Sequence, residues 1–396
     1  MSTEPLSSEP LSSEPLSSEC GRSAFLSLPG AVEGSGSEAG VALHYGNPVQ
    51  EQRALAAGEA IVDLSHHSVL TITGPDRLSW LDSISSQSIA KLAPGESSET
   101  LILDPNGRVE HAARLVDDGE ALWLLVERDD AQALLDWLNS MKFMLRVELA
   151  DRSADYAAIG TLGEVAQSLA LSPATSNGVP LVWRDPWPAV TAGGHQYATT
   201  PVHPSADFPY REVLVLRADQ VAATALPVAG TLALEALRIA AWRPRFAAEV
   251  DERTIPHELD WLRSAVHLNK GCYRGQETVA KVHNLGHPPR RLVMLHLDGS
   301  DGVLPAHGDE VILLGSGDDD GKGEDVVVGR VTSAARHHEL GPIALTVIKR
   351  TVDPLAALAV LAEGIRIAAA QEIIVPTDAG AEANVPRLPR LGAVRR

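Results

Sequence analysis

A cysteine stands between two cationic side chains in one short segment of the chain, and this is where we expect chemistry. The segment consists of Lys270, Gly271, Cys272, Tyr273, Arg274, Gly275, Gln276 and Glu277. Positive potential stabilises a thiolate over a thiol, so the neighbouring lysine and arginine should favour a reactive Cys272. Glycine adopts positive φ at little cost, so Gly271 and Gly275 would let the backbone approach a ligand closely. The alternative is that Cys272 packs as a small hydrophobic residue, as most free cysteines do.

Two histidine pairs, His66–His67 and His337–His338, could suggest a metal site, because imidazole is a common metal ligand. Neither pair comes with a spaced set of carboxylates or thiols, so we predict no metal site. Two cysteines cannot hold an iron–sulfur cluster with four thiolates, so any cluster that this chain meets belongs to another protein. Thiol redox chemistry would need a second cysteine, and Cys20 is the one candidate.

The composition is that of a globular protein with more than one domain. Of the 396 residues, 44% are hydrophobic and 21% are charged, which allows a large buried core. The net charge of −19 repels polyanions, so we predict no direct contact with nucleic acid. The most apolar stretch, residues 355–375, is interrupted by Glu363, Arg366 and Glu372, and we predict no membrane span. Two cysteines and no secretory signal pattern favour a reducing cytoplasm.

The elements before the cysteine segment form a tail and a first domain. Residues 1–40 contain a polar repeat, Ser-Ser-Glu-Pro-Leu, and we expect them to be disordered, since they can bury little. We assign residues 41–150 to a first domain. It has a short helix at Arg77–Ile84 and a hairpin at Asp104–Gly107, whose Asn-Gly step favours a tight turn.

The remaining chain predicts a second α+β domain and a barrel. Residues 151–285 include helices at residues 164–171 and 231–241, and the second of these leads to the cysteine segment. Residues 286–376 alternate strand-like runs with glycine-rich loops, which is typical of a small β-barrel. Residues 377–396 are expected to be a flexible tail.

The cysteine segment resembles the signature of the YgfZ-type folate-binding proteins, relatives of the glycine-cleavage T-protein (aminomethyltransferase). Leu101–Val109 resembles the first-domain hairpin of that family, and Glu235–Ile239 through Ile255–Pro256 resembles the segment before its cysteine loop. The resemblance covers about residues 45–376. It implies an α+β fold with T-protein-like domains around a central channel and a C-terminal β-barrel.

The same resemblance implies a function. Members bind tetrahydrofolate and support the assembly or repair of iron–sulfur clusters in client enzymes, including radical enzymes that methylthiolate transfer RNA. The partners would then be a folate and iron–sulfur client enzymes, with the oligomeric state left open. The alternative is a folate-dependent one-carbon (aminomethyl) transferase.

The sequence departs from the T-protein at the positions that matter for transfer. Ala112 stands where the T-protein has the acidic residue that activates aminomethyl transfer, and Ile239-Ala240-Ala241 stands where it has a glutamate that binds the pterin ring. His67 and Leu234 align with two tryptophans that hold the ring in some relatives. These departures favour the accessory role over the transferase.

Three further residues are candidates for folate contacts. Trp242 could stack on the pterin, or it could be a core tryptophan. Arg238 could bind the carboxylates of the glutamate tail, or it could be a surface arginine. Lys281, with Arg290 and Arg291, forms the densest basic run in an acidic chain and could meet polyglutamate or a partner, or be a solvated strand end.

Overall fold

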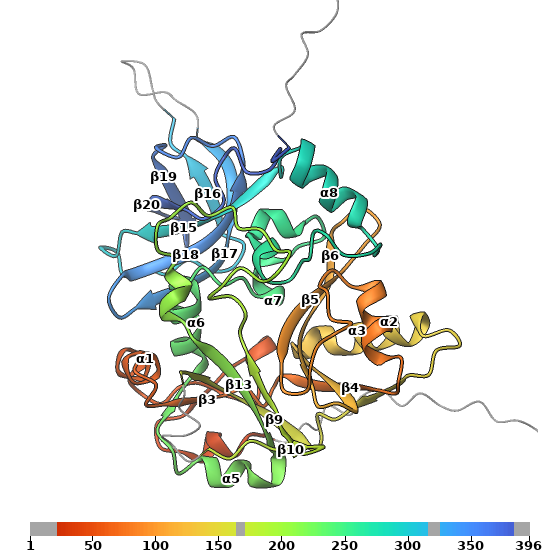
Figure 1. The fold of residues 1–396 in the computed structure, drawn as a ribbon. Helices are drawn as coiled ribbons and strands as arrows, with labels where there is room; N and C mark the ends of the chain where they lie inside the picture. The colour runs from red at the N-terminus through yellow and green to blue at the C-terminus, as the bar shows by residue number, and fades with distance from the viewer. Residues whose placement is uncertain (1–21, 164–170, 316–324, 384–396) are drawn as a thin grey trace, which may run out of the picture.

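The computed structural model describes residues 22–163, 171–315 and 325–383, which form two five-stranded sheets and a closed barrel (Figure 1). The barrel (blue) lies at one end of the molecule, and the two sheets lie side by side at the other. The segment from α6 to α8 runs between them. Among the described residues, no helix combines the length and the apolar character needed to cross a membrane.

The first sheet carries the predicted hairpin. Its strands pair in the order β5-β6-β7-β4-β8, with bounds β4 Ser68–Thr73, β5 Ser97–Leu103, β6 Val109–Asp117, β7 Ala121–Val126 and β8 Glu148–Asp151. Helices α2 (Arg77–Ile84) and α3 (Arg128–Met141) pack on it. At the turn, Asp104 Oδ1 accepts bonds from the backbone N–H groups of Asn106 and Arg108, and Gly107 has φ +78°. The turn prediction is confirmed because these residues satisfy the turn's own backbone.

The second sheet takes a strand from the segment that we assigned to the first domain. Its order is β12-β13-β9-β3-β14, with bounds β3 Ile61–Asp63, β9 Tyr156–Leu162, β12 Val182–Arg184, β13 Tyr210–Leu216 and β14 Val228–Ala229. Helices α1 (Pro48–Ala56) and α6 (Thr231–Ala240) pack against each other beside it. A boundary near residue 150 therefore separates strands that pair, because β3 is hydrogen-bonded to β9.

Residues 22–40 are folded, so the expectation of disorder through residue 40 is wrong for this part. Phe25 in the 3-10 helix η1 (Ala24–Ser27) is fully buried and packs with Ile61, Ile159 and Val213 of the second sheet. The segment continues through β1 (Val32–Glu33), η2 (Gly36–Glu38) and β2 (Ala42–His44). One large aromatic side chain supplies the apolar burial that the repeat lacks. The repeat itself lies outside the described residues.

The barrel prediction is confirmed. Six strands close in the order β15-β18-β17-β16-β19-β20, with bounds β15 Arg290–Leu297, β16 Glu310–Leu313, β17 Val326–His337, β18 Gly341–Lys349, β19 Leu358–Ala362 and β20 Ile365–Ile373. The apolar stretch at residues 355–375 supplies the last two strands. Residues 377–383, expected to be flexible, pack against the body: Ala379 is buried, and the Glu382 N–H donates to the His283 carbonyl.

Short elements complete the connections. They are β10 Thr175–Ser176, β11 Val179–Pro180, η3 Pro204–Asp207, η4 Arg217–Asp219, α5 Gln220–Ala223, α7 Phe246–Glu249, η5 Pro256–Leu259, η6 Trp261–Arg263 and α8 Gln276–Leu285. The helix expected at residues 164–171 falls on residues 164–170, which lie outside the described residues.

Candidate functional site

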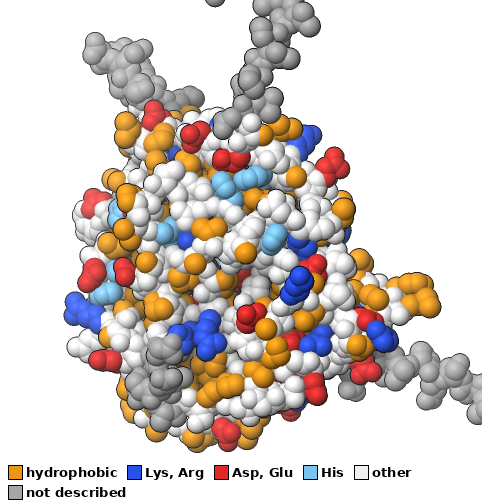
Figure 2. Space-filling view, in the orientation of Figure 1, with side chains coloured by type: hydrophobic (Ala, Val, Ile, Leu, Met, Phe, Trp, Pro, Cys, Tyr) orange, Lys and Arg blue, Asp and Glu red, His pale blue; other side chains and the backbone are white. Residues whose placement is uncertain are grey.

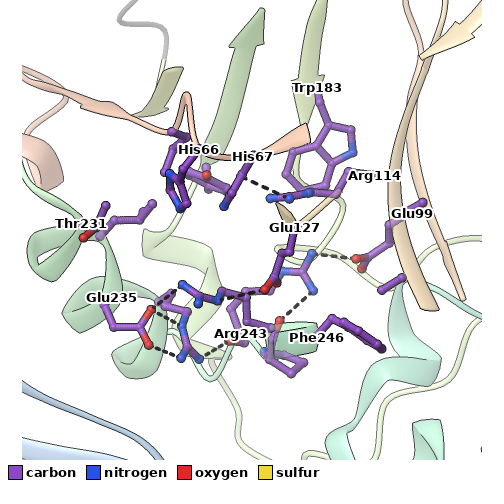
Figure 3. Close-up of a pocket in the computed structure, with 18 of the residues that line it drawn as sticks. His66, His67, Glu99, Arg114, Glu127, Trp183, Thr231, Glu235, Arg243 and Phe246 are labelled. Carbon is purple, nitrogen blue, oxygen red and sulfur yellow. Dashed lines mark hydrogen bonds and ion pairs between the residues drawn. The ribbon is translucent and has the colours of Figure 1, made fainter. Parts of the chain in front are cut away.

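A pocket of about 80 Å³ lies where both sheets, α6 and the segment after α6 meet (Figure 3). Its aromatic walls are Trp183, Phe208, Tyr210, Phe246 and Trp261. Its charged lining consists of Glu38, Glu99, Glu127 and Glu235 with Arg114, Arg238, Arg243 and Arg245. Flat aromatic walls with polar groups between them suit a flat heteroaromatic ring.

Glu99 on β5 presents a carboxylate oxygen without a donor. Its side chain is buried, and its Oε2 accepts bonds from Arg243 Nη2 at 2.7 Å and from Trp261 Nε1 at 3.3 Å. Its Oε1 has no hydrogen-bond partner among the described residues. Leaving a buried acceptor unpaired costs free energy, so a ligand that brings an N–H donor would relieve this cost.

Glu99 is the functional candidate that sequence reasoning missed. The available signal was a single acidic residue in the polar first half of β5, two positions before the apolar run Leu101-Ile102-Leu103. Its partner Arg243 is 144 positions away and is also bonded to Asp185, at 2.9 Å. Those long-range contacts decide that the carboxylate faces a pocket, and a sequence pattern does not contain them.

Arg238, a predicted folate contact, lines the pocket but is already paired. Helix α6 buries Ala233, Ala236 and Leu237 against the body, which sets Arg238 on the inner side. Its guanidinium bonds to Glu235 on the preceding turn and to Glu249, the latter at 3.1 Å. A buried arginine with two carboxylates has little charge left for a ligand.

Arg245 ties several of the pocket's carboxylates together. It lies 3.2 Å from Glu38, 3.5 Å from Glu235 and 3.7 Å from Glu127, measured between nitrogen and oxygen. Burial raises the pKa of the Glu38 carboxyl, and Arg245 offsets part of that rise. The pKa of Arg245 itself is raised: burial opposes the rise, and the surrounding carboxylates outweigh it. The arginine therefore stays charged and joins three lining carboxylates by ion pairs.

The histidine pair at β3–β4 faces the same pocket in neutral form. Burial, with help from nearby arginines, lowers the pKa of His66 to about 3 and that of His67 well below its ordinary value. His67 Nδ1 lies 3.4 Å from Arg114 Nη2, which favours an acceptor nitrogen there. Among residues 22–163, 171–315 and 325–383, no three His, Cys, Asp or Glu side chains are grouped to hold a metal ion.

Three positions singled out by the resemblance also line the pocket. They are His67, Leu234 and Ala112. The alanine contributes a methyl group to the wall at the position where the T-protein has its acidic residue. Two of the lining carboxylates, Glu127 and Glu235, interact with arginines instead.

The other predicted folate contacts lie elsewhere. Trp242 is 2% exposed, belongs to the central core and is not part of the pocket lining. It has φ +58°, a strained backbone for a bulky residue, and its ring meets His203 edge-on at 5.2 Å. Lys281 is exposed on α8, away from the lining residues. Arg290 pairs with Asp251 at 2.6 Å and Glu258 at 2.8 Å.

The cysteine loop is outside the pocket. Cys272 is exposed, whereas the next residue, Tyr273, is buried in the core and anchors the loop. Lys270 Nζ donates to the carbonyls of Ser85 and Gln87 at 3.0 and 2.7 Å. Arg274 pairs with Glu110 at 2.6 Å. The two cations thus fasten the loop to the first sheet and α2, and the thiol is left open to solvent.

The two glycines of the loop differ. Gly275 has φ +83°, as expected, and a Cβ there would lie 2.6 Å from the Asp104 carbonyl oxygen and 3.0 Å from Gly107 Cα. Gly271 does not have positive φ, and a Cβ there would meet nothing within 4 Å. The expectation of positive φ is therefore confirmed at Gly275 and wrong at Gly271.

Alanine substitutions should separate these two glycines. We expect Gly275→Ala to lower the free energy of unfolding by about 1–3 kcal/mol, because it combines backbone strain with a clash against the β5–β6 hairpin. Gly271→Ala should change it by less than about 0.5 kcal/mol. Urea denaturation of both variants measures the difference. Equal stabilities would contradict the close packing of loop and hairpin.

Comparisons with known proteins agree with this architecture. Residues 36–178 match the GCVT N-terminal domain family. An aminomethyltransferase of Symbiobacterium thermophilum is 27% identical over 74% of this chain and 79% of its own length. An aminomethyltransferase of Herpetosiphon aurantiacus is 27% identical over 65% of this chain and 72% of its own.

A solved structure has the same fold. The glycine cleavage system aminomethyltransferase T from Bartonella henselae superposes with a TM-score of 0.65, covering 88% of this chain and 94% of that one at 17% sequence identity. The chain is related to the aminomethyltransferases in sequence and in fold. This fold is T-protein-like, with the closed barrel at its C-terminal end.

Proposed function

We propose that the pocket binds tetrahydrofolate with its pterin ring against the aromatic walls. The observation that carries this proposal is the unpaired Oε1 of Glu99, buried in the pocket wall. A pterin ring presents adjacent N–H donors on one edge, and a carboxylate oxygen is the acceptor that such an edge needs. Glu99 would supply the partner that the segment Ile239-Ala240-Ala241 does not.

The lining residues fit a reduced folate in charge as well. Neutral His66 and His67 add no positive charge, and His67 can offer a ring nitrogen to a polar ring atom. The arginines are held by carboxylates, so the pocket is close to neutral where the ring would lie. Tetrahydrofolate, when bound, carries one-carbon units on its ring nitrogens.

Within this proposal the protein is an accessory factor of the YgfZ type rather than an aminomethyltransferase. Ala112 has no group that could accept or donate a proton, and the lining residues Glu127 and Glu235 interact with arginines. Cys272 is exposed outside the pocket, where a client protein can reach it. The substrate of that interaction is the iron–sulfur cluster of a client enzyme. The clients include radical enzymes that methylthiolate transfer RNA.

The second candidate is a folate-dependent aminomethyl transferase, which the names of the relatives favour. A turnover assay distinguishes the two. We expect the purified full chain, given tetrahydrofolate and an aminomethyl donor, to form no 5,10-methylenetetrahydrofolate above the uncatalysed rate. An aminomethyltransferase assayed in parallel is the positive control. Saturable turnover that requires the pocket residues would establish the transferase and overturn the accessory role.

A further inference from the structure

A groove of about 190 Å³ lies between α8 and the first residues of the cysteine loop. It is lined by Gly193–Gly194, by Leu268–Asn269 and, on α8, by Ala280, His283 and Asn284. The three helix residues share one face, because they are three or four positions apart. The volume is more than ten times the roughly 10–15 Å³ that one water molecule needs, so the groove has room for side chains.

The groove offers both apolar and amide groups to an occupant. Leu268 and Ala280 supply apolar surface, and the Leu268 N–H donates to the Gly193 carbonyl at 2.8 Å, which fixes this wall. The side-chain amide of Asn269 has no hydrogen-bond partner in the part of the chain that the structure describes. An amide can donate to and accept from a peptide backbone, so the lining suits an extended peptide segment.

Residues 376–383 are fastened to α8 at this groove (dark blue in Figure 1). Gly380 has φ +88°, and a Cβ there would lie 2.4 Å from the Gly286 carbonyl oxygen, so the two backbones are in close contact. The Ala383 N–H donates to the carbonyl of Asn284 at 3.2 Å. Figure 2 shows histidine side chains at the surface near this end of α8. The chain therefore arrives at position 383 on a residue that lines the groove.

We propose that residues 384–396 dock in this groove and extend over the Cys272 loop, so that a client must displace them to reach the thiol. They follow Ala383 directly and carry Val385, Leu388 and Leu391 for the apolar part of the groove. Thirteen extended residues span up to about 43 Å. The eight residues of α8 from Asn284 back to Gln276, which begins the helix, cover about 12 Å. The segment is therefore long enough.

Charge complementarity and connectivity both select this occupant. Residues 384–396 contain four arginines and no carboxylate, in a chain whose net charge is −19. Glu277 lies on the first turn of α8, between the groove and the Cys272 loop. It is exposed and has no ion-pair partner in the described ranges, so it can pair with one of these arginines. A segment tethered beside its site has an effective concentration on the order of millimolar, which a second copy or a free peptide does not have.

The docking itself does not depend on the proposed function, whereas its effect on clients rests on that function. The test therefore measures the thiol directly. In a Cys20→Ser background, Cys272 is the one remaining cysteine. The rate at which a neutral polyethylene-glycol maleimide labels it is compared between the full chain and a chain that ends at Ala383. A full chain with residues 384–396 in scrambled order keeps length and charge and is the matched control.

We expect the shortened chain and the scrambled chain to be labelled at least about fivefold faster than the full chain. A synthetic peptide of residues 384–396 should slow the labelling of the shortened chain again. Equal rates in the full and shortened chains would overturn the inference, and so would a scrambled segment that protects as well as the natural one. Protection that disappears on dilution would also overturn it, because the segment would then come from a second copy.

A pair of substitutions on α8 assigns the protection to the groove. Ala280→Trp fills the groove and should label as fast as the shortened chain, whereas Lys281→Trp places the same side chain outside the lining and should label slowly. Thermal unfolding checks that both variants fold. Slow labelling of a folded Ala280→Trp variant would contradict docking in this groove. Tetrahydrofolate titration of the shortened chain should match that of the full chain, so failure of the docking inference leaves the folate proposal standing.

Discussion

We expect Glu99→Gln to weaken tetrahydrofolate binding by about tenfold to a hundredfold. A hydrogen bond to a charged group contributes about 1.5–3 kcal/mol. In the variant, the pterin edge would meet a neutral amide with one acceptor oxygen in place of a carboxylate. The substitution keeps the size of the side chain, and Arg243 keeps its bond to Asp185 at 2.9 Å. The pocket should therefore retain its shape. Calorimetric titration of the variant gives the dissociation constant directly.

The matched control is Glu252→Gln, which removes one carboxylate from an exposed position outside the pocket lining. It should bind tetrahydrofolate as the wild type does. Thermal unfolding of both variants checks that the fold survives. If both bind folate with unchanged affinity, Glu99 does not contact the ring and the proposed orientation of the pterin is wrong.

The second large effect concerns the thiol. We expect Cys272→Ala to leave the free energy of unfolding within about 0.5 kcal/mol of the wild type, because the side chain is exposed and makes no core contact. Tetrahydrofolate binding should also be unchanged, since Cys272 is not part of the pocket lining. Support of client methylthiolation in cells should be lost. Urea denaturation, folate titration and nucleoside analysis of transfer RNA measure the three properties.

Cys272→Ser provides the control for shape, because it replaces only the sulfur. A protein whose thiol is the reactive group should lose client support in both variants. Retained support together with a marked loss of stability would mean that Cys272 serves packing, which was the alternative that its sequence context left open.

Local sequence signals predicted those elements whose causes are local. The Asn-Gly turn at Asp104–Gly107, helix α2 at Arg77–Ile84 and the alternation of strands with glycine-rich loops in residues 286–376 all depend on neighbouring residues. The folded segment around Phe25 escaped prediction because its burial depends on Ile159 and Val213, more than a hundred residues away. The pairing of β3 with β9, which joins the two predicted domains, is non-local in the same way.

The residues of the candidate site show the same difference between local and long-range causes. The resemblance marked Ala112, His67 and Leu234, side-chain chemistry suggested Arg238, and all four line the pocket. It could not show that Arg238 is already paired, or that Trp242 turns into the core. Glu99 became a candidate only when its burial and its unpaired Oε1 were known, and the two donors to its Oε2, Arg243 and Trp261, lie on distant segments.

The central claim is that this pocket binds a reduced folate, and calorimetric titration of the purified full chain with tetrahydrofolate tests it most directly. The account predicts saturable binding at a single site, weakened by Glu99→Gln and unaffected by Cys272→Ala. A titration without saturable binding, or binding equally strong in all three proteins, would contradict it.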